Sequence, residues 1–64
     1  MKDKKNFVAR IHQLIAVDRN AVDIYTSLAD MVDEQPFKND FKRILEDEER
    51  HVALGQKILK ILGE

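Results

Sequence analysis

Three side chains in this sequence have the chemistry and the spacing of metal ligands. Glu48 and His51 form a Glu-x-x-His pair, and Asp18 precedes Glu48 by thirty residues. Residues three apart on a helix project from the same side, so the carboxylate and the imidazole of the pair point the same way. Carboxylate oxygen and imidazole nitrogen bind divalent ions such as iron, manganese and zinc. A metal site follows if the fold brings Asp18 next to the pair.

Two segments with alternating three- and four-residue apolar spacing carry these candidate ligands. The members of the first seam are Val8, Ile11, Ile15, Asp18, Val22, Tyr25, Ala29 and Val32. The members of the second seam are Phe37, Phe41, Ile44, Glu48, His51, Gly55, Ile58 and Leu62. Such spacing is typical of helices that pack along one face. Apart from Gly55, only the candidate ligands interrupt the apolar pattern, so all three are expected at packed positions.

Pro36, the only proline, marks the break between the two helices, because the residue before a proline is pushed away from helical dihedrals. Gly63 follows the last apolar residue and is a suitable C-terminal cap. We therefore predict helices at about 6–33 and 37–62. A connection this short makes the helices antiparallel neighbours. The predicted fold is all-α, with one helical hairpin domain over residues 1–64.

Composition excludes several classes of protein. With 64 residues, of which 44% are hydrophobic and 36% charged, the chain forms at most one domain. A chain this short buries too little surface to be stable without a partner or a metal. It has no cysteine, which rules out disulfides, thiolate zinc sites and iron–sulfur clusters. A net charge of −1, with acids and bases interleaved, indicates no nucleic-acid partner. The sequence lacks a signal-peptide core and any run of roughly 20 apolar residues, so we expect no membrane contact and a cytoplasmic location.

The hairpin places the three candidate ligands in one layer. In a hairpin centred between Glu34 and Gln35, residues whose numbers sum to about 69 lie at the same height. Asp18 then faces His51, with Glu48 one turn away. Three ionisable groups at packed positions would cost on the order of several kcal/mol without compensation, and a bound cation compensates them directly.

Self-association completes the site in the pattern of di-iron helical bundles. These use one carboxylate from each of two helices and Glu-x-x-His from each of two others. A lone hairpin would leave much of a second apolar row on each helix exposed to water, and exposed patches of that kind usually mark an interface. The rows are Phe7, Leu14, Ala21 and Leu28 on the first helix and Leu45, Val52 and Leu59 on the second. A two-fold dimer, forming a four-helix bundle, supplies four carboxylates and two imidazoles, whose negative charges balance two divalent cations. This donor set suits iron or manganese, with zinc as a competitor.

The run from about Ile11 to Leu59, with Asp18, then Tyr25, then Glu48-x-x-His51, resembles the metal-binding half of ferritin-like proteins. It resembles in particular the encapsulated ferritins, in which two-helix protomers pair. The resemblance implies ferroxidase activity for iron storage or detoxification: two ferrous ions bind between subunits, dioxygen or peroxide accepts their electrons, and ferric iron passes to a store. It also implies that Glu48 bridges the metals, that Asp18 and His51 are terminal ligands, and that the shell protein of a nanocompartment is a further partner. At Asp18 the family has Glu, which reaches one methylene further.

Four further residues carry weaker expectations. Helical side chains lean towards the N-terminus, which aims the Tyr25 hydroxyl at the ligand layer; a supporting redox role and plain packing are the alternatives. Gly55 indicates close backbone approach, space next to the metals, or a tolerated flaw. Asp47 either holds the ligand imidazole or is a solvated acid. His12 is expected at the surface.

Two other functions fit the same residues. Hydrogen bonds alone could satisfy the polar layer, in which case the chain is a metal-free helical module for dimerisation or an adaptor. The same metal centre could instead support peroxide reduction or substrate oxygenation, as in rubrerythrin-type proteins. Metal content measured together with solution mass separates the metal-free module from the metalloproteins.

Overall fold

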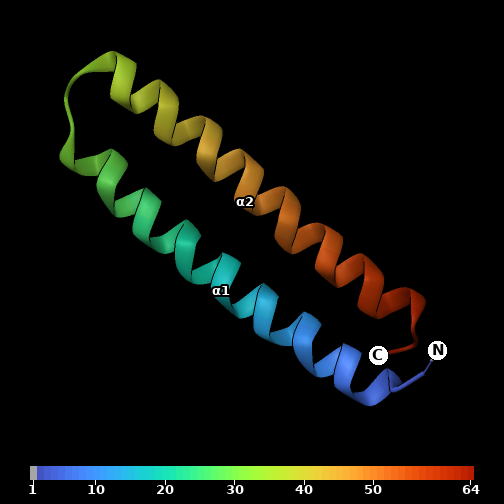
Figure 1. Ribbon diagram of the computed structural model, residues 1–64. Helices are drawn as coiled ribbons and strands as arrows, with labels where there is room; N and C mark the ends of the chain where they lie inside the picture. Colours follow the sequence, from blue (N-terminus) through green and yellow to red (C-terminus); the bar gives the residue numbers. More distant parts are fainter. Residues whose placement is uncertain (1) are drawn as a thin grey trace.

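The computed structural model describes residues 2–64 as two long antiparallel helices joined by a short loop (Figure 1). Helix α1 comprises Lys4–Met31 and helix α2 comprises Gln35–Ile61, with no strand in the described part of the chain. The hairpin is a rod of 48 × 15 × 14 Å. Its all-helical class and hairpin form are confirmed, with helix ends within two residues of the predicted ones. Within residues 2–64, neither helix is long and apolar enough to cross a membrane.

Asp3 sets the start of α1. Its backbone lies in the left-handed region, with φ 58° and ψ 50°, and its carboxylate accepts a hydrogen bond from the Asn6 amide at 3.4 Å. An N-cap aspartate satisfies one of the amides that the first turn leaves without an intrahelical partner. The helix therefore begins at Lys4, two residues before the predicted start. At its other end, Val32 has extended dihedrals, which ends α1 two residues earlier than predicted.

Pro36 and Gly63 mark the two ends of α2. Pro36 lies in the first turn, where its missing amide hydrogen would have no intrahelical acceptor. Gly63 adopts φ 79°, and its amide donates to the Lys60 carbonyl at 3.1 Å. The Glu64 amide donates to the Leu59 carbonyl at 2.9 Å. This pair of hydrogen bonds is a Schellman motif, which satisfies the last carbonyls of a helix and confirms the glycine cap.

The first seam is the packed face of α1, because each of its members is buried or half-buried. On α2 the second seam is covered in the same way except at Phe37 and His51, which are exposed. Among the described hydrophobic residues, only Ile15 and Leu59 are buried, each with 7% of its surface exposed. Two helices enclose no interior, so the core of the hairpin is a single line of contacts.

The second apolar rows differ between the helices. The row on α2 packs within the hairpin, so the expectation that it would be wet is wrong; its members are Leu45, Val52 and Leu59. Helix α1 covers this row, because Arg19 and Val22 of α1 line the same groove as Val52. The row on α1 is the exposed one, with only its alanine half-buried; its members are Phe7, Leu14, Ala21 and Leu28.

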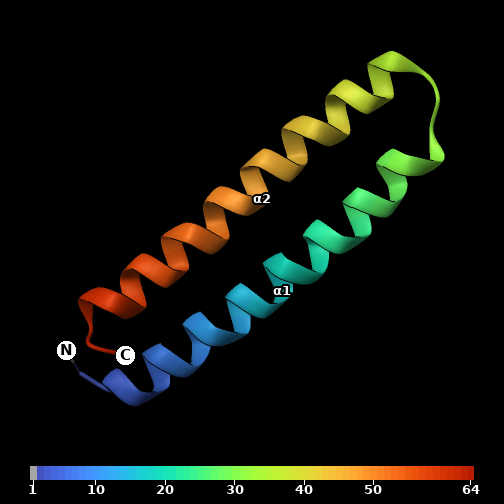
Figure 2. The same cartoon turned by 180° about the vertical axis from the view of Figure 1, so that it is seen from behind.

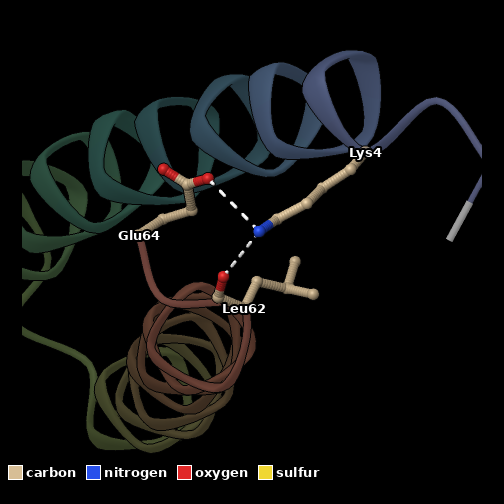
Figure 3. A network of polar contacts seen from close by, with 3 residues as sticks. All are labelled: Lys4, Leu62 and Glu64. Carbon is tan, nitrogen blue, oxygen red and sulfur yellow. Dashed lines mark hydrogen bonds and ion pairs between the residues drawn. The ribbon is translucent and has the colours of Figure 1, made fainter.

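Polar contacts join the helices at both ends of the hairpin. The chain ends lie together at the end opposite the loop, as both views show (Figures 1 and 2). There the Lys4 Nζ atom donates to the Leu62 carbonyl at 2.8 Å and lies 3.9 Å from the Glu64 carboxylate (Figure 3). Near the loop, the Lys38 Nζ atom donates to the Ala29 carbonyl at 3.5 Å. These contacts help to hold the helices in one register.

Candidate metal centre

The observed register brings Asp18 opposite the Glu-x-x-His pair. Contacts along the hairpin join residues whose numbers sum to between 66 and 70, namely Lys4 with Leu62, Ile15 with Gly55, and Tyr25 with Phe41. The predicted sum of about 69 falls inside this interval. Asp18 in the middle of α1 therefore lies at the height of Glu48 and His51 on α2.

Asp18, Glu48 and His51 form one cluster of possible metal ligands. Each offers one ligand atom, and the three atoms lie within 4.8 Å of one another. Two ligands on opposite sides of one zinc-sized ion are about 4.2 Å apart, since each bond is about 2.1 Å long. Asp18 and Glu48 are half-buried, whereas His51 is exposed and has room to rotate. The triad is thus close to a binding geometry that a small side-chain movement completes.

Glu48 carries the clearest sign of an unmet interaction. Its Oε2 atom is buried and has no hydrogen-bond partner among the described residues. The ion pairs of the described chain, which involve Lys4, Arg43 and Arg50, leave the triad without a lysine or arginine partner. A buried polar group without a partner costs on the order of 1–3 kcal/mol, and more when charged. The residues therefore fit a cation, which would pair with this oxygen.

The triad opens onto one of the two grooves between the helices. Asp18 and His51 line this groove, which has a volume of about 280 Å³. Its remaining lining is apolar and consists of Ile11, Leu14, Ile15, Leu54, Gly55 and Ile58. The groove on the opposite side of the hairpin is lined mainly by charged residues: Arg19, Asp23 and Glu49 with Val22 and Val52. The first groove, called the apolar groove below, is the one through which Asp18 and His51 are reached.

Gly55 lets the helices approach closely beside the triad. It is buried one turn after His51, and a Cβ atom added to it would lie 2.7 Å from Ile15 Cγ1 and 3.1 Å from Ile15 Cδ1. Real Cβ atoms essentially never show a contact as short as the one to Cγ1, so a larger residue would force Ile15 or the helices to shift. Of the explanations for this glycine, close backbone approach is confirmed.

The remaining residues singled out from the sequence lie around the triad without joining it. Tyr25 packs on Phe41, with ring centroids 6.2 Å apart at 41°, and within residues 2–64 no hydrogen bond joins its hydroxyl to the triad. Packing accounts for Tyr25, and its redox role stays a prediction. Asp47 pairs with Arg50 on its own helix, which favours the solvated acid over a support for the imidazole. His12 is exposed, as expected.

Sequence reasoning missed Leu54 as a neighbour of the site. Leu54 lines the apolar groove next to His51 and opposite Leu14, although 57% of its surface is exposed. The spacing in the sequence could have predicted this position, because Leu54 lies three residues after His51 and four before Ile58, on the same side of α2.

No protein-family model, curated protein or solved structure matches the chain. The likeness to ferritin-like proteins therefore rests on the residues of the triad and on their spacing alone.

Proposed function

We propose that this protein is a metal-binding protein of the di-iron carboxylate type, with Asp18, Glu48 and His51 as ligands. In this proposal a second copy of the hairpin supplies three further ligands, and the shared centre oxidises Fe(II) to Fe(III). The observation that carries the proposal is the buried, unpartnered Glu48 Oε2 atom, which lies in a cluster whose three ligand atoms are within 4.8 Å of one another.

The charge of the triad supports one divalent cation per chain. Two carboxylates contribute two negative charges, and the neutral imidazole contributes a nitrogen ligand. Without a cation, these groups share a confined space and Glu48 keeps a buried oxygen without a partner. Three ligands leave coordination positions open, which a substrate or the ligands of a second copy can occupy.

Each residue has a definite part in the proposed centre. Asp18 and Glu48, both half-buried, neutralise the ions and hold them between the helices. His51 faces the apolar groove, where a side-chain rotation can admit or release an ion. Two ferrous ions bound together would each give up one electron, and dioxygen or hydrogen peroxide would take up the two electrons. Iron is then the substrate as well as the bound metal.

Metal content and solution mass, measured on the same sample, test this proposal. We expect about one iron per chain in a dimer, and a ferric absorbance band after aerobic addition of Fe(II). Glu48→Gln should lower iron affinity at least about 100-fold, beyond the 10–100-fold typical of a residue that only supports a ligand. Glu49→Gln is the matched control, because Glu49 is the neighbouring exposed acid outside the triad.

A metal-free dimerisation module is the second candidate, favoured by the exposed apolar row on α1. It predicts no metal by elemental analysis and no change of the melting temperature on adding a chelator or Fe(II). A dimer with both of these properties would replace the ferroxidase proposal.

A further inference from the structure

Helix α1 carries a second seam whose side chains are mostly exposed in the hairpin. This outer seam follows the same alternating three- and four-residue spacing, with the polar Arg10 at one position. Its apolar members are Phe7, Leu14, Val17, Ala21, Ile24, Leu28 and Met31. All but the half-buried Ala21 are exposed, from 37% for Phe7 to 78% for Met31.

The outer seam faces a different direction from the packed seam. Each of its members precedes a member of the packed seam by one residue, which turns it by about 100° around the helix. Leu14 belongs to the outer seam and also lines the apolar groove, so the outer seam borders that groove. A helix in a four-helix bundle packs against two neighbours through two faces at roughly this angle. Helix α1 thus has the two faces that a bundle requires, with one of them uncovered.

The exposed surface of the hairpin exceeds that of a typical monomer by the area of one interface. The hairpin exposes 5176 Å². A folded monomer of its mass, 7.5 kDa, exposes about 4,200 Å² by the usual scaling of surface with mass. The excess, about 1,000 Å², is comparable to the roughly 800 Å² that each partner buries in a standard protein–protein interface.

The outer seam is complementary to itself when two copies of α1 run antiparallel. Its spacing is symmetric about residue 19, so residues whose numbers sum to 38 lie opposite each other. The opposed pairs are Phe7 with Met31, Arg10 with Leu28, Leu14 with Ile24, and Val17 with Ala21. Each pair joins one large apolar residue to another residue of the seam, and Ala21 leaves room next to Val17 near the centre.

Charges at the two ends of α1 favour the antiparallel arrangement over the parallel one. The start of the helix is basic, with exposed Lys5 and Arg10, and its end is acidic, with exposed Asp30 and Asp33. A parallel pair would bring two basic ends together and two acidic ends together. An antiparallel pair places each basic start beside an acidic end, and Lys5 falls at the height of Asp33.

We propose that the outer seam is the dimer interface of this protein, and that α1 packs antiparallel on α1 of a second copy with residues summing to 38 opposed. This inference takes its partner, a second copy of the chain, from the proposed function. It adds which surface of α1 forms the interface and which residues face each other across it. The two-fold axis crosses α1 at the height of Arg19, beside Asp18. Both copies of the triad then lie at nearly one height, as a shared two-metal centre requires.

Cysteine cross-linking of the full chain in a chelator tests the register without any metal. The chain has no cysteine, so each introduced thiol is unique. Val17→Cys mixed with Ala21→Cys should give an oxidised dimer in at least about tenfold greater yield than either variant alone, because only the mixture places two thiols opposite each other. Ala16→Cys, exposed on another side of α1, is the control and should cross-link with neither.

A second variant tests the interface by mass. Ile24→Lys replaces a side chain that is 51% exposed in the hairpin, so the hairpin should keep its helicity while the dimer becomes a monomer. Asp23→Lys adds the same residue at the neighbouring exposed position and should stay dimeric.

The outcomes separate this inference from the proposed function. A dimer with the Val17–Ala21 cross-link supports the interface even if no iron binds. A protein that stays monomeric in chelator and with Fe(II), or one that cross-links best through Val17→Cys alone, overturns the antiparallel interface. Iron binding by such a protein would leave the ligand assignment standing.

Discussion

Gly55 of α2 lies directly against Ile15 of α1, so close that a Cβ atom on the glycine would be 2.7 Å from Ile15 Cγ1. This contact lies one turn from His51, and it sets the separation of the helices where Asp18 must reach the other two ligands. Substitutions at Gly55 therefore probe packing and the triad together.

Gly55→Ala is expected to lower both the stability and the metal affinity. Overpacking costs about 1–3 kcal/mol, and the gain in helix propensity of about 1 kcal/mol offsets only part of it. Urea unfolding and a competitive metal titration measure the two effects. Adding Ile15→Ala, which removes the clashing atoms, should make the glycine substitution harmless in a double-mutant cycle. If Gly55→Ala lowered the free energy of unfolding equally in the wild-type protein and in the Ile15→Ala variant, the result would contradict this contact.

Glu48→Gln should stabilise the metal-free protein while it weakens metal binding. The substitution replaces a carboxylate that has a buried, unpartnered oxygen with a neutral amide of similar size, which removes a negative charge from a position where it has no partner. Thermal unfolding in chelator measures this gain, and Glu49→Gln should leave the melting temperature unchanged. A loss of stability in Glu48→Gln would mean that the carboxylate already has a partner in solution.

Divalent metal should raise the melting temperature through the triad. A ligand that binds only the folded state at 100 times its dissociation constant adds about 2.7 kcal/mol to the free energy of unfolding. We expect this increase with Mn(II) or anaerobic Fe(II), its reversal by chelator, and its absence in Asp18→Asn. An unchanged increase in Asp18→Asn would show that the ion binds elsewhere.

Gly63→Ala should destabilise the hairpin through the backbone alone. Gly63 has φ 79°, and a Cβ atom there would meet nothing within 4 Å. The left-handed conformation costs an alanine about 1–2 kcal/mol, so the end of α2 should fray and the unfolding midpoint should fall. Gly63→Asn should lose less, because asparagine tolerates this conformation better. Equal losses for the two variants would contradict the glycine cap.

The alternation of apolar residues, together with the break at Pro36, was sufficient to predict the packed seam and the register that aligns Asp18 with the pair. These features depend on helical geometry, which spacing alone encodes. The start of α1 was misplaced although Asp3, a favourable N-cap residue, precedes it.

Side-chain exposure was harder to predict than register. The fates of the two second apolar rows depend on what the facing helix offers, and only the folded hairpin shows that α1 covers Val52 whereas α2 leaves Leu14 exposed. The sequence likewise does not distinguish the exposed His51 from the half-buried Asp18 and Glu48, because all three occupy equivalent seam positions.

The contact between Lys4 and Leu62 keeps both chain ends at one pole of the rod, which is 48 Å long. A fluorophore attached at either end of a hairpin therefore reports the same pole. In an antiparallel pair the poles of the two copies point in opposite directions, so donor and acceptor dyes on separate copies would be about one rod length apart. In a parallel pair the two dyes would be adjacent. The efficiency of energy transfer would therefore distinguish an antiparallel from a parallel assembly.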